Sequence, residues 1–275
     1  MKPARMPVVF LPHGGGPWPF IDEKLFGMPG MWDEMSAYMK ALSMVPPETP
    51  RAVLVVSAHW EAEVPTVMSA AQPPMLYDYQ GFPPEAYEVE WSAPGDPELA
   101  VKIRDRLEAA GIRSGLDAVR GFDHGSFVPM KLAYPGADVP AMQVSLKRGL
   151  DPLEHIEIGR ALAPLRDEGV YIVASGMSYH NLRELLGRMR ARKPGVIQAS
   201  LAFDDWLAET VGMAESKRAT RLVEWERAPS ARAAHPREEH LIPLMVAVGA
   251  AGGDPGTLPY RDVVMGAHVS AVHFG

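Results

Sequence analysis

Histidines are the side chains of this chain that could hold a transition metal or move a proton near neutral pH. Three of the nine share one setting. His13 and His59 each come within two residues of the end of an apolar run that predicts a buried strand, and His180 lies six residues beyond a third such run. In open α/β sheets, ligands bind outside the carboxyl ends of the strands. We therefore expect these three imidazoles to converge on one crevice.

The ligand types available to a metal are limited by the absence of cysteine. Disulfides, Fe–S clusters, thiolate zinc sites and cysteine nucleophiles are excluded. Imidazole suits Fe, Zn, Cu and Ni, and carboxylate is the other ligand to consider. A single histidine is more often a hydrogen-bonded core or surface residue, and we assign His155, His268 and His273 to that ordinary role.

A second cluster of polar residues lies between His235 and His240. Pro236 predicts the first turn of a helix over 236–251, with Glu239 and His240 in that turn. Acidic residues there could simply complement the helix dipole. His240 begins the apolar face of the predicted helix and could therefore point inward. The spacing is not that of the H-E-x-x-H zinc helix.

Two further motifs have ordinary interpretations when taken alone. The run 13–16 reads His-Gly-Gly-Gly, which is also the oxyanion-hole motif of some α/β-hydrolase esterases. Those enzymes need G-x-S-x-G, but 176–180 has His180 in place of the second glycine, and the histidine motif comes first in the chain. The sequence argues against an esterase. In the cluster 121–125, Asp123 fits a turn and His124 a loop histidine.

The chain alternates strands with helices, which predicts an α/β fold with a central mixed sheet flanked by helices, in a single domain covering 1–275. A proline- and tyrosine-rich loop over 71–95 is long enough to be packed over a site. The predicted strands are 7–11, 51–57, 139–146, 170–174 and 263–274. The predicted helices are 32–44, 97–110 with Asp96 as N-cap, 153–167, 196–211, 218–225 and 236–251.

Composition narrows the class of protein. The 275 residues are 47% hydrophobic and 22% charged, which excludes a disordered chain. The net charge of −7 makes nucleic acid a poor partner. The longest apolar run, 241–253, is short of the ~20 residues that span a bilayer, and the amino terminus lacks the apolar region of a signal peptide. We expect a soluble, cytoplasmic protein with no membrane partner; its oligomeric state, a homo-oligomer included, is left open.

Eight short motifs occur in one order along the chain. They are Pro12-His13-Gly14-Gly15-Gly16-Pro17, Val56-Ser57-Ala58-His59-Trp60, Gly81-Phe82-Pro83, Ala93-Pro94-Gly95, Gly121-Phe122-Asp123-His124-Gly125, Ser175-Gly176-Met177, His180-Asn181-Leu182 and Glu239-His240-Leu241-Ile242-Pro243. In this order they resemble the class III extradiol ring-cleavage dioxygenases (LigB superfamily), specifically the DOPA-dioxygenase-like branch. The resemblance runs from about residue 7 to 275.

The resemblance implies an α/β enzyme with a non-haem Fe(II) that cleaves a catechol ring beside its hydroxyls, using O₂ and a small aromatic diol. It implies that His13, His59 and His240 are the metal ligands. His240 stands where other branches carry glutamate, a change often found with Zn(II). His180 matches the acid/base histidine, and His124 matches a histidine that faces a ligand or the substrate. His235 is matched less securely.

Two other functions remain open at this point. One is a zinc-dependent hydrolase that uses the same histidines, and the other is a non-catalytic binding protein on this fold. Metal content and oxygen uptake with a catechol separate the first from a dioxygenase, and the intact histidines argue against the second. Arg120 and Arg183 could meet a substrate carboxylate, although a surface position is the commoner role for each. Aromatic residues of the 71–95 loop could shape the pocket or serve packing.

Overall fold

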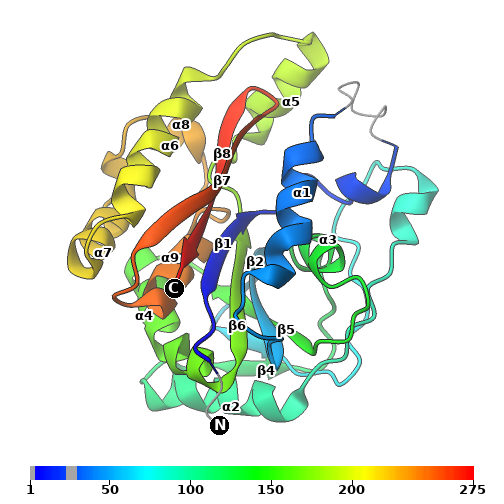
Figure 1. The fold of residues 1–275 in the computed structure, drawn as a ribbon, viewed down its shortest axis with the longest axis vertical. Helices are drawn as coiled ribbons and strands as arrows, with labels where there is room; N and C mark the ends of the chain where they lie inside the picture. Colours follow the sequence, from blue (N-terminus) through cyan, green and yellow to red (C-terminus); the bar gives the residue numbers. More distant parts are fainter. Residues whose placement is uncertain (1–3, 23–29) are drawn as a thin grey trace.

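One eight-stranded mixed sheet runs through the protein (Figure 1). The computed structural model describes residues 4–22 and 30–275. The strands are β1 Val8–Pro12, β2 Ala52–Ala62, β3 Thr66–Met68, β4 Gly115–Asp117, β5 Ala141–Lys147, β6 Val170–Gly176, β7 Gly256–Val264 and β8 Ala267–Phe274. They lie in the order β4-β3-β5-β2-β6-β1-β8-β7. The predicted fold class, an α/β fold with a central mixed sheet flanked by helices, is confirmed.

Helices cover both faces of the sheet. Within the described residues they are α1 Asp33–Ala41, α2 Pro97–Ala109, α3 His124–Ala133, α4 Pro152–Leu162, α5 Leu182–Ala191, α6 Gln198–Val211, α7 Glu215–Val223, α8 Ala231–Ala234 and α9 Ile242–Ala251. The 3₁₀ helices are η1 Trp18–Phe20, η3 Leu42–Met44, η4 Pro84–Tyr87, η5 Ala163–Glu168 and η6 Trp225–Arg227. Helices α4 and α9 lie on one side of β1 and β6, and α1 and α3 lie on the other (Figure 1).

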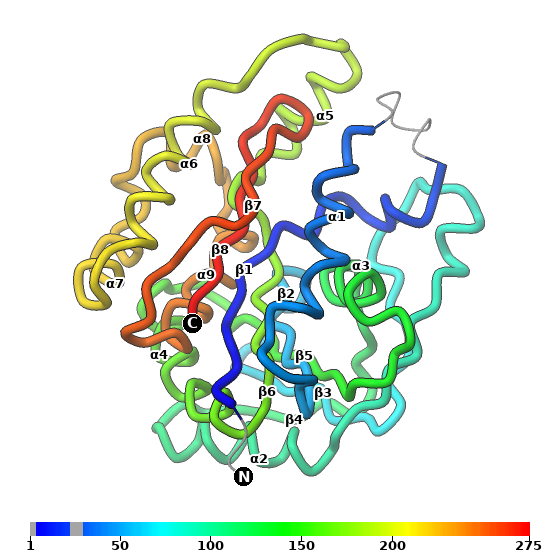
Figure 2. The backbone as a smooth tube through the Cα atoms, viewed as in Figure 1, coloured from blue at the N-terminus to red at the C-terminus, as the bar shows by residue number. Residues whose placement is uncertain are grey.

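The middle of the sheet is parallel and buried. Strands β5, β2, β6 and β1 pair in parallel, and β8 pairs antiparallel with β1. Figure 2 shows β1, in blue, beside the red β8, so the first and last strands of the chain are neighbours. Every residue of β1 and β6 is buried, as expected for parallel strands covered on both faces. The carboxyl ends of four parallel strands therefore share one edge, and His13 directly follows β1 there.

Side-chain caps fix the starts of α2, α3, α4 and α5. Asp96, Asp123, Asp151 and Asn181 each accept a hydrogen bond from the backbone N–H three residues further on. The predicted cap at Asp96 is confirmed, with its Oδ1 2.9 Å from the Leu99 nitrogen. Asn181 caps α5, which leaves the side chain of the neighbouring His180 free of that role.

The predicted strand 51–57 is longer than expected. Strand β2 continues to Ala62, so His59 lies inside the strand and does not follow it. Pairing with β6 ends at Ser57, and the register with β5 shifts between Val56 and Glu61. His59 occupies this irregular stretch, where β2 has parted from β6 but pairs again with β5 from Glu61 onward.

The final predicted strand, 263–274, is wrong as a single element. The structure has a hairpin, β7 and β8, with Met265 and Gly266 in the turn. Both turn residues have positive φ, 51° and 83°. A methionine seldom adopts this conformation, so the turn carried no sequence signal.

The predicted helix 236–251 begins later than expected. Helix α9 starts at Ile242, with Pro243 in its first turn, and His240 precedes it. The carbonyl of His240 accepts a hydrogen bond from the Met177 nitrogen at 2.9 Å, so the segment is tied to the end of β6 and does not continue the helix. All ten residues of α9 are buried, so the helix has no single apolar face.

The other predicted helices and strands are present. The sequence analysis missed the short strands β3 and β4 and the helices α3, α5 and α8. Among the described residues, no helix combines the length and the apolar composition that crossing a bilayer requires.

Helices α4 and α9 touch through their backbones at two glycines. A Cβ on Gly159 would lie 2.1 Å from the Val246 oxygen, and one on Gly249 would lie 2.0 Å from the Ile156 oxygen. We expect Gly249→Ala to lower the free energy of unfolding by about 1–3 kcal/mol, because the helices must move apart. Urea denaturation measures the change. Gly187→Ala in α5 is the control, since its Cβ meets no atom within 4 Å; equal stability of the two variants would contradict the prediction.

Candidate metal centre

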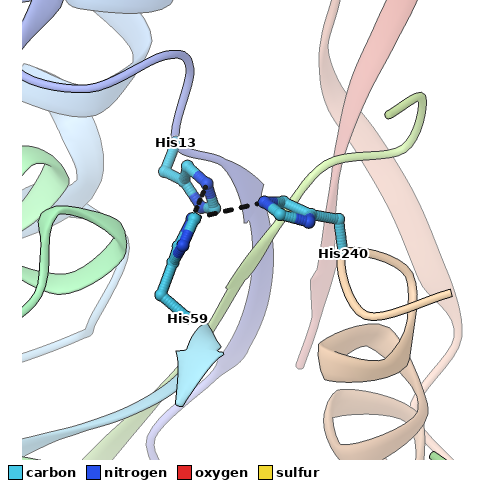
Figure 3. A group of neighbouring side chains, drawn as sticks. All are labelled: His13, His59 and His240. Carbon is cyan, nitrogen blue, oxygen red and sulfur yellow. Dashed lines mark hydrogen bonds between the residues drawn. The ribbon is translucent and has the colours of Figure 1, made fainter. Parts of the chain in front are cut away.

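Three histidine side chains meet at the carboxyl edge of the parallel strands. Figure 3 shows His13 after β1, His59 from β2 and His240 from the segment before α9, with their rings pointing toward one another. The Nε2 atoms of His13 and His59 are 3.0 Å apart, and those of His59 and His240 are 3.3 Å apart. Two imidazoles bound to one metal at 2.0–2.1 Å hold their nitrogens about 3.0–3.4 Å apart. The three residues therefore fit one metal ion.

The same three histidines are neutral at neutral pH. Burial, and then the neighbouring imidazoles, lower the pKa of His13 and of His240 well below 6.5. Burial also lowers the pKa of His59 to about 4, helped by His124. A metal ligand must offer an unprotonated nitrogen, so the low pKa values favour metal binding.

Ser175, in β6, fixes the tautomer of His13. The Ser175 hydroxyl lies 3.0 Å from His13 Nδ1 and donates its own hydrogen to the carbonyl of Gly125. It can therefore only accept from His13, which places the ring proton on Nδ1 and leaves the Nε2 lone pair free.

Asp78 joins His124 to His59. Its Oδ1 accepts hydrogen bonds from the backbone N–H of His124 at 3.0 Å and from His124 Nδ1 at 2.8 Å. Its Oδ2 lies 3.4 Å from His59 Nδ1. Burial opposes ionisation of Asp78, yet the hydrogen bond from His124 and the two imidazoles outweigh it and lower its pKa. An ionised Asp78 favours a proton on both Nδ1 atoms, through a hydrogen bond at His124 and through electrostatic attraction at His59.

Glu239 does the same for His180 and His240. Its Oε1 lies 3.1 Å from His180 Nδ1 and 2.9 Å from His240 Nδ1. Burial acts to raise the pKa of Glu239, but the hydrogen bond with His180 and nearby charges lower it overall. The two rings stack with centroids 3.4 Å apart. The carboxylate thus contacts Nδ1 of His180, and the Nε2 atom of that ring is on the opposite side from this contact.

A glycine at the end of β6 makes room for His240. A Cβ on Gly176 would lie 2.1 Å from the carbonyl oxygen of His240, the same oxygen that accepts from the Met177 nitrogen. Only glycine allows this close approach. The end of β6 therefore sets the position of the His240 backbone as well as the tautomer of His13.

Asp123 is the centre of a buried hydrogen-bond network beneath the cluster. It accepts from the Ser57 hydroxyl at 2.8 Å, from Arg120 at 2.8 Å and from the Gln143 amide at 2.7 Å. Arg120 also donates to the carbonyl of His59 at 3.2 Å. Arg120 is therefore neither a surface charge nor free to meet a substrate carboxylate, and Asp123 does more than start a turn.

Of the six histidines that the family resemblance singled out, the structure brings five together: His13, His59, His124, His180 and His240. His235 lies outside the cluster: it is buried near Phe203, and its Nε2 is 3.0 Å from the Ser178 carbonyl. The sequence analysis missed Asp78. It lies in the 71–95 loop, where nothing in the sequence separates it from the other acidic residues.

The fold and the cluster together define a class. The chain is an α/β protein with three neutral imidazoles that can hold a metal ion, and with two further histidines oriented by carboxylates beside them. Residues 26–274 match the family model of the catalytic LigB subunit of aromatic ring-opening dioxygenase, and the chain belongs to this family of metal-dependent enzymes. Its enzyme class is that of an extradiol aromatic ring-opening dioxygenase.

Several named relatives agree with this assignment. The chain is 36% identical to dioxygenase tasH of Hapsidospora irregularis, covering 98% of this chain and 85% of the relative. It is 42% identical to a 4,5-DOPA dioxygenase extradiol of Beta vulgaris over 74% of each chain. A crystal structure of an uncharacterised Escherichia coli K12 protein superposes with a TM-score of 0.79 at 31% identity, covering 98% of this chain and 100% of that one.

Because His235 is buried, the free energy of unfolding should depend on pH. Burial lowers its pKa to about 3, against 6.5 for an exposed histidine. The unfolded chain therefore binds the proton more readily, and stability present above pH 6.5 is lost as the pH falls toward 3. His235→Gln keeps a donor for Ser178 but cannot titrate. Between pH 6 and 4 we expect the unfolding free energy of the variant to fall less steeply than that of the wild type. The difference between the two slopes should be about 1.4 kcal/mol per pH unit. Urea denaturation at each pH measures this; equal slopes would contradict it.

Proposed function

We propose that this chain is a non-haem Fe(II) extradiol dioxygenase that opens the ring of a small catechol-type diol with O₂. His13, His59 and His240 are the proposed metal ligands, and His180 and His124 the proposed proton-transfer residues. The observation that carries the proposal is the convergence of three Nε2 atoms whose Nδ1 partners are all fixed. The relatives named 4,5-DOPA dioxygenase extradiol support a catechol-type substrate.

The metal supplies one part of the chemistry and the chain the rest. Fe(II), when bound, lowers the pKa of a diol hydroxyl and has coordination positions left for both diol oxygens and O₂. Asp78 and Glu239 orient two of the proposed ligands, His59 and His240, and add two negative charges close to the metal, while Ser175 orients His13. Zn(II) fits the same nitrogen ligands.

His180 is the proposed acid/base. Glu239 holds its Nδ1 proton, so Nε2 is free to accept a proton from the substrate hydroxyl and to return it later. The imidazolium that forms is stabilised by the adjacent carboxylate. His124 has the same arrangement with Asp78, and its ring centroid lies 4.0 Å from that of His59 and 5.3 Å from that of His13. We assign His124 to a hydrogen bond with the substrate or O₂ on the opposite side.

The deciding experiment is loading the protein anaerobically with Fe(II) and screening catechols for oxygen uptake and a yellow ring-cleavage product. Uptake of one O₂ per ring opened supports the dioxygenase. A zinc-loaded protein that hydrolyses esters or amides without taking up O₂ would support the hydrolase, and diol binding without turnover would support a binding protein.

We also propose that residues 1–275 form one catalytic domain, since β1 and β8 pair directly and the proposed ligands come from both ends of the chain. A cytoplasmic location remains a prediction, favoured by the absence of cysteine.

His240 and His235 form a matched pair for testing the metal ligands. We expect His240→Ala to lose the metal, because one of three nitrogens is gone. We expect His235→Ala to keep it, because His235 bonds the Ser178 carbonyl away from the cluster. Metal content per folded protein, measured by mass spectrometry with folding checked by circular dichroism, tests both. Equal loss of metal in the two variants would refute this ligand set.

Replacing His180 separates proton transfer from metal binding. We expect His180→Ala to keep its metal and still bind catechol, while kcat falls 10²–10⁴-fold, the usual contribution of general acid–base catalysis. Measurement of kcat and bound iron on the same preparation decides. Full activity would remove His180 from the mechanism, and an iron-free variant would make it a ligand.

A further inference from the structure

A small cavity of about 50 Å³ adjoins the histidine cluster on the side of His180. It lies between α5 and the turn of the β7–β8 hairpin, which are neighbours at one end of the molecule (Figure 1). The described residues that line it are Gly14, Gly15, Trp32, Met177, Tyr179, His180, Leu182, Leu185, Val264, Met265, Ala267 and Val269.

The cavity is one imidazole away from the proposed ligands. The ring of His180 stacks on His240 and also lines the cavity. Gly14 and Gly15, which directly follow His13, line it as well, and a Cβ on Gly15 would meet no atom within 4 Å. An aromatic ring bound at the cluster beside His180 therefore has the cavity within reach of one of its substituents.

The lining selects an apolar group. Apart from His180, the described side chains that line the cavity are uncharged, and the Tyr179 hydroxyl already donates to Glu184 at 2.9 Å. A charged substituent would lose its water here, and His180 is the one side chain of the described lining that could pair with it. A cavity of roughly 150 Å³ holds a benzene ring, and one of roughly 10–15 Å³ holds a water. A cavity of about 50 Å³ thus suits a short hydrocarbon group.

We propose that this cavity binds an alkyl substituent of two or three carbons on the substrate ring. The chain would then select short alkylcatechols over catechols that carry an amino-acid side chain. The part of this inference that concerns turnover rests on the proposed function. The part that concerns binding can be tested without turnover.

The test compares catechol with its methyl, ethyl, propyl and pentyl derivatives, substituted at carbon 3 or 4, and with 3,4-dihydroxyphenylalanine. Burying each added methylene should raise kcat/KM of the iron-loaded enzyme about fourfold, up to propyl. Pentyl should bring no further gain, and 3,4-dihydroxyphenylalanine should fall at least tenfold below propylcatechol. Dissociation constants on the zinc-loaded protein, measured by calorimetry, should follow the same order.

Variants of the lining locate the effect. Leu185→Phe fills the cavity and should reduce the preference for propylcatechol over catechol at least tenfold, and Ala267→Leu should do so independently from the hairpin side. Leu185→Ala enlarges the cavity and should move the optimum to a longer chain. Leu186→Phe is the control, because Leu186 is the next residue of α5, is 37% exposed and does not line the cavity; it should keep the wild-type preference.

The outcomes separate the two proposals. Cleavage of catechol with no gain from alkyl groups, or a gain that Leu185→Phe and Ala267→Leu both leave intact, would overturn the cavity assignment and leave the dioxygenase standing. Tighter binding of propylcatechol to the zinc form, lost in those variants, would support the cavity even if no ring is opened. A preference for 3,4-dihydroxyphenylalanine over propylcatechol would also overturn it.

Discussion

The site depends on carboxylates that hold the Nδ1 protons of buried histidines. A neutral imidazole has two tautomers of similar energy, and only the one with a free Nε2 can serve at this cluster. Asp78 selects that tautomer for His59 and His124, and Glu239 selects it for His180 and His240. Each carboxylate therefore contacts one proposed ligand and one proposed proton-transfer residue. A change in the charge of the ligand consequently alters the hydrogen bond that the proton-transfer residue makes with the same carboxylate.

The fold supplies the rigid surroundings that this arrangement requires. Burial lowers the pKa values of the ligand histidines, and the same burial would make ionised carboxylates costly if they had no hydrogen-bond donors. The parallel strands end at one edge of the sheet. There, Ser175 and Gly176 of β6 orient His13 and His240. The Asp123 network beneath the cluster fixes Arg120, which in turn bonds the backbone of His59.

Sequence reasoning predicted what local patterns encode. Buried strands β1, β2 and β6, the capped helix α2 and the position of His13 at a strand end all follow from apolar runs and cap residues. His240 was singled out, but its helix was not placed correctly, because a long-range hydrogen bond from Met177 overrides the local helix signal of Pro236. Asp78 was missed for a similar reason: its role comes from a loop folding back onto residues far away in the chain.

The pairing of β1 with β6 and β8 has a consequence for how the protein is made. Among the described strands β1 is synthesised before the others, yet its partners in the sheet are β6 and β8, which follow much later in the chain. Until β6 emerges, the apolar strand β1 has no strand to pair with. His13 likewise lacks its contacts with Ser175, His59 and His240. The three proposed ligands therefore cannot come together until β6 has been synthesised. Until then β1 is an unpaired apolar segment, which is the kind of segment that aggregates.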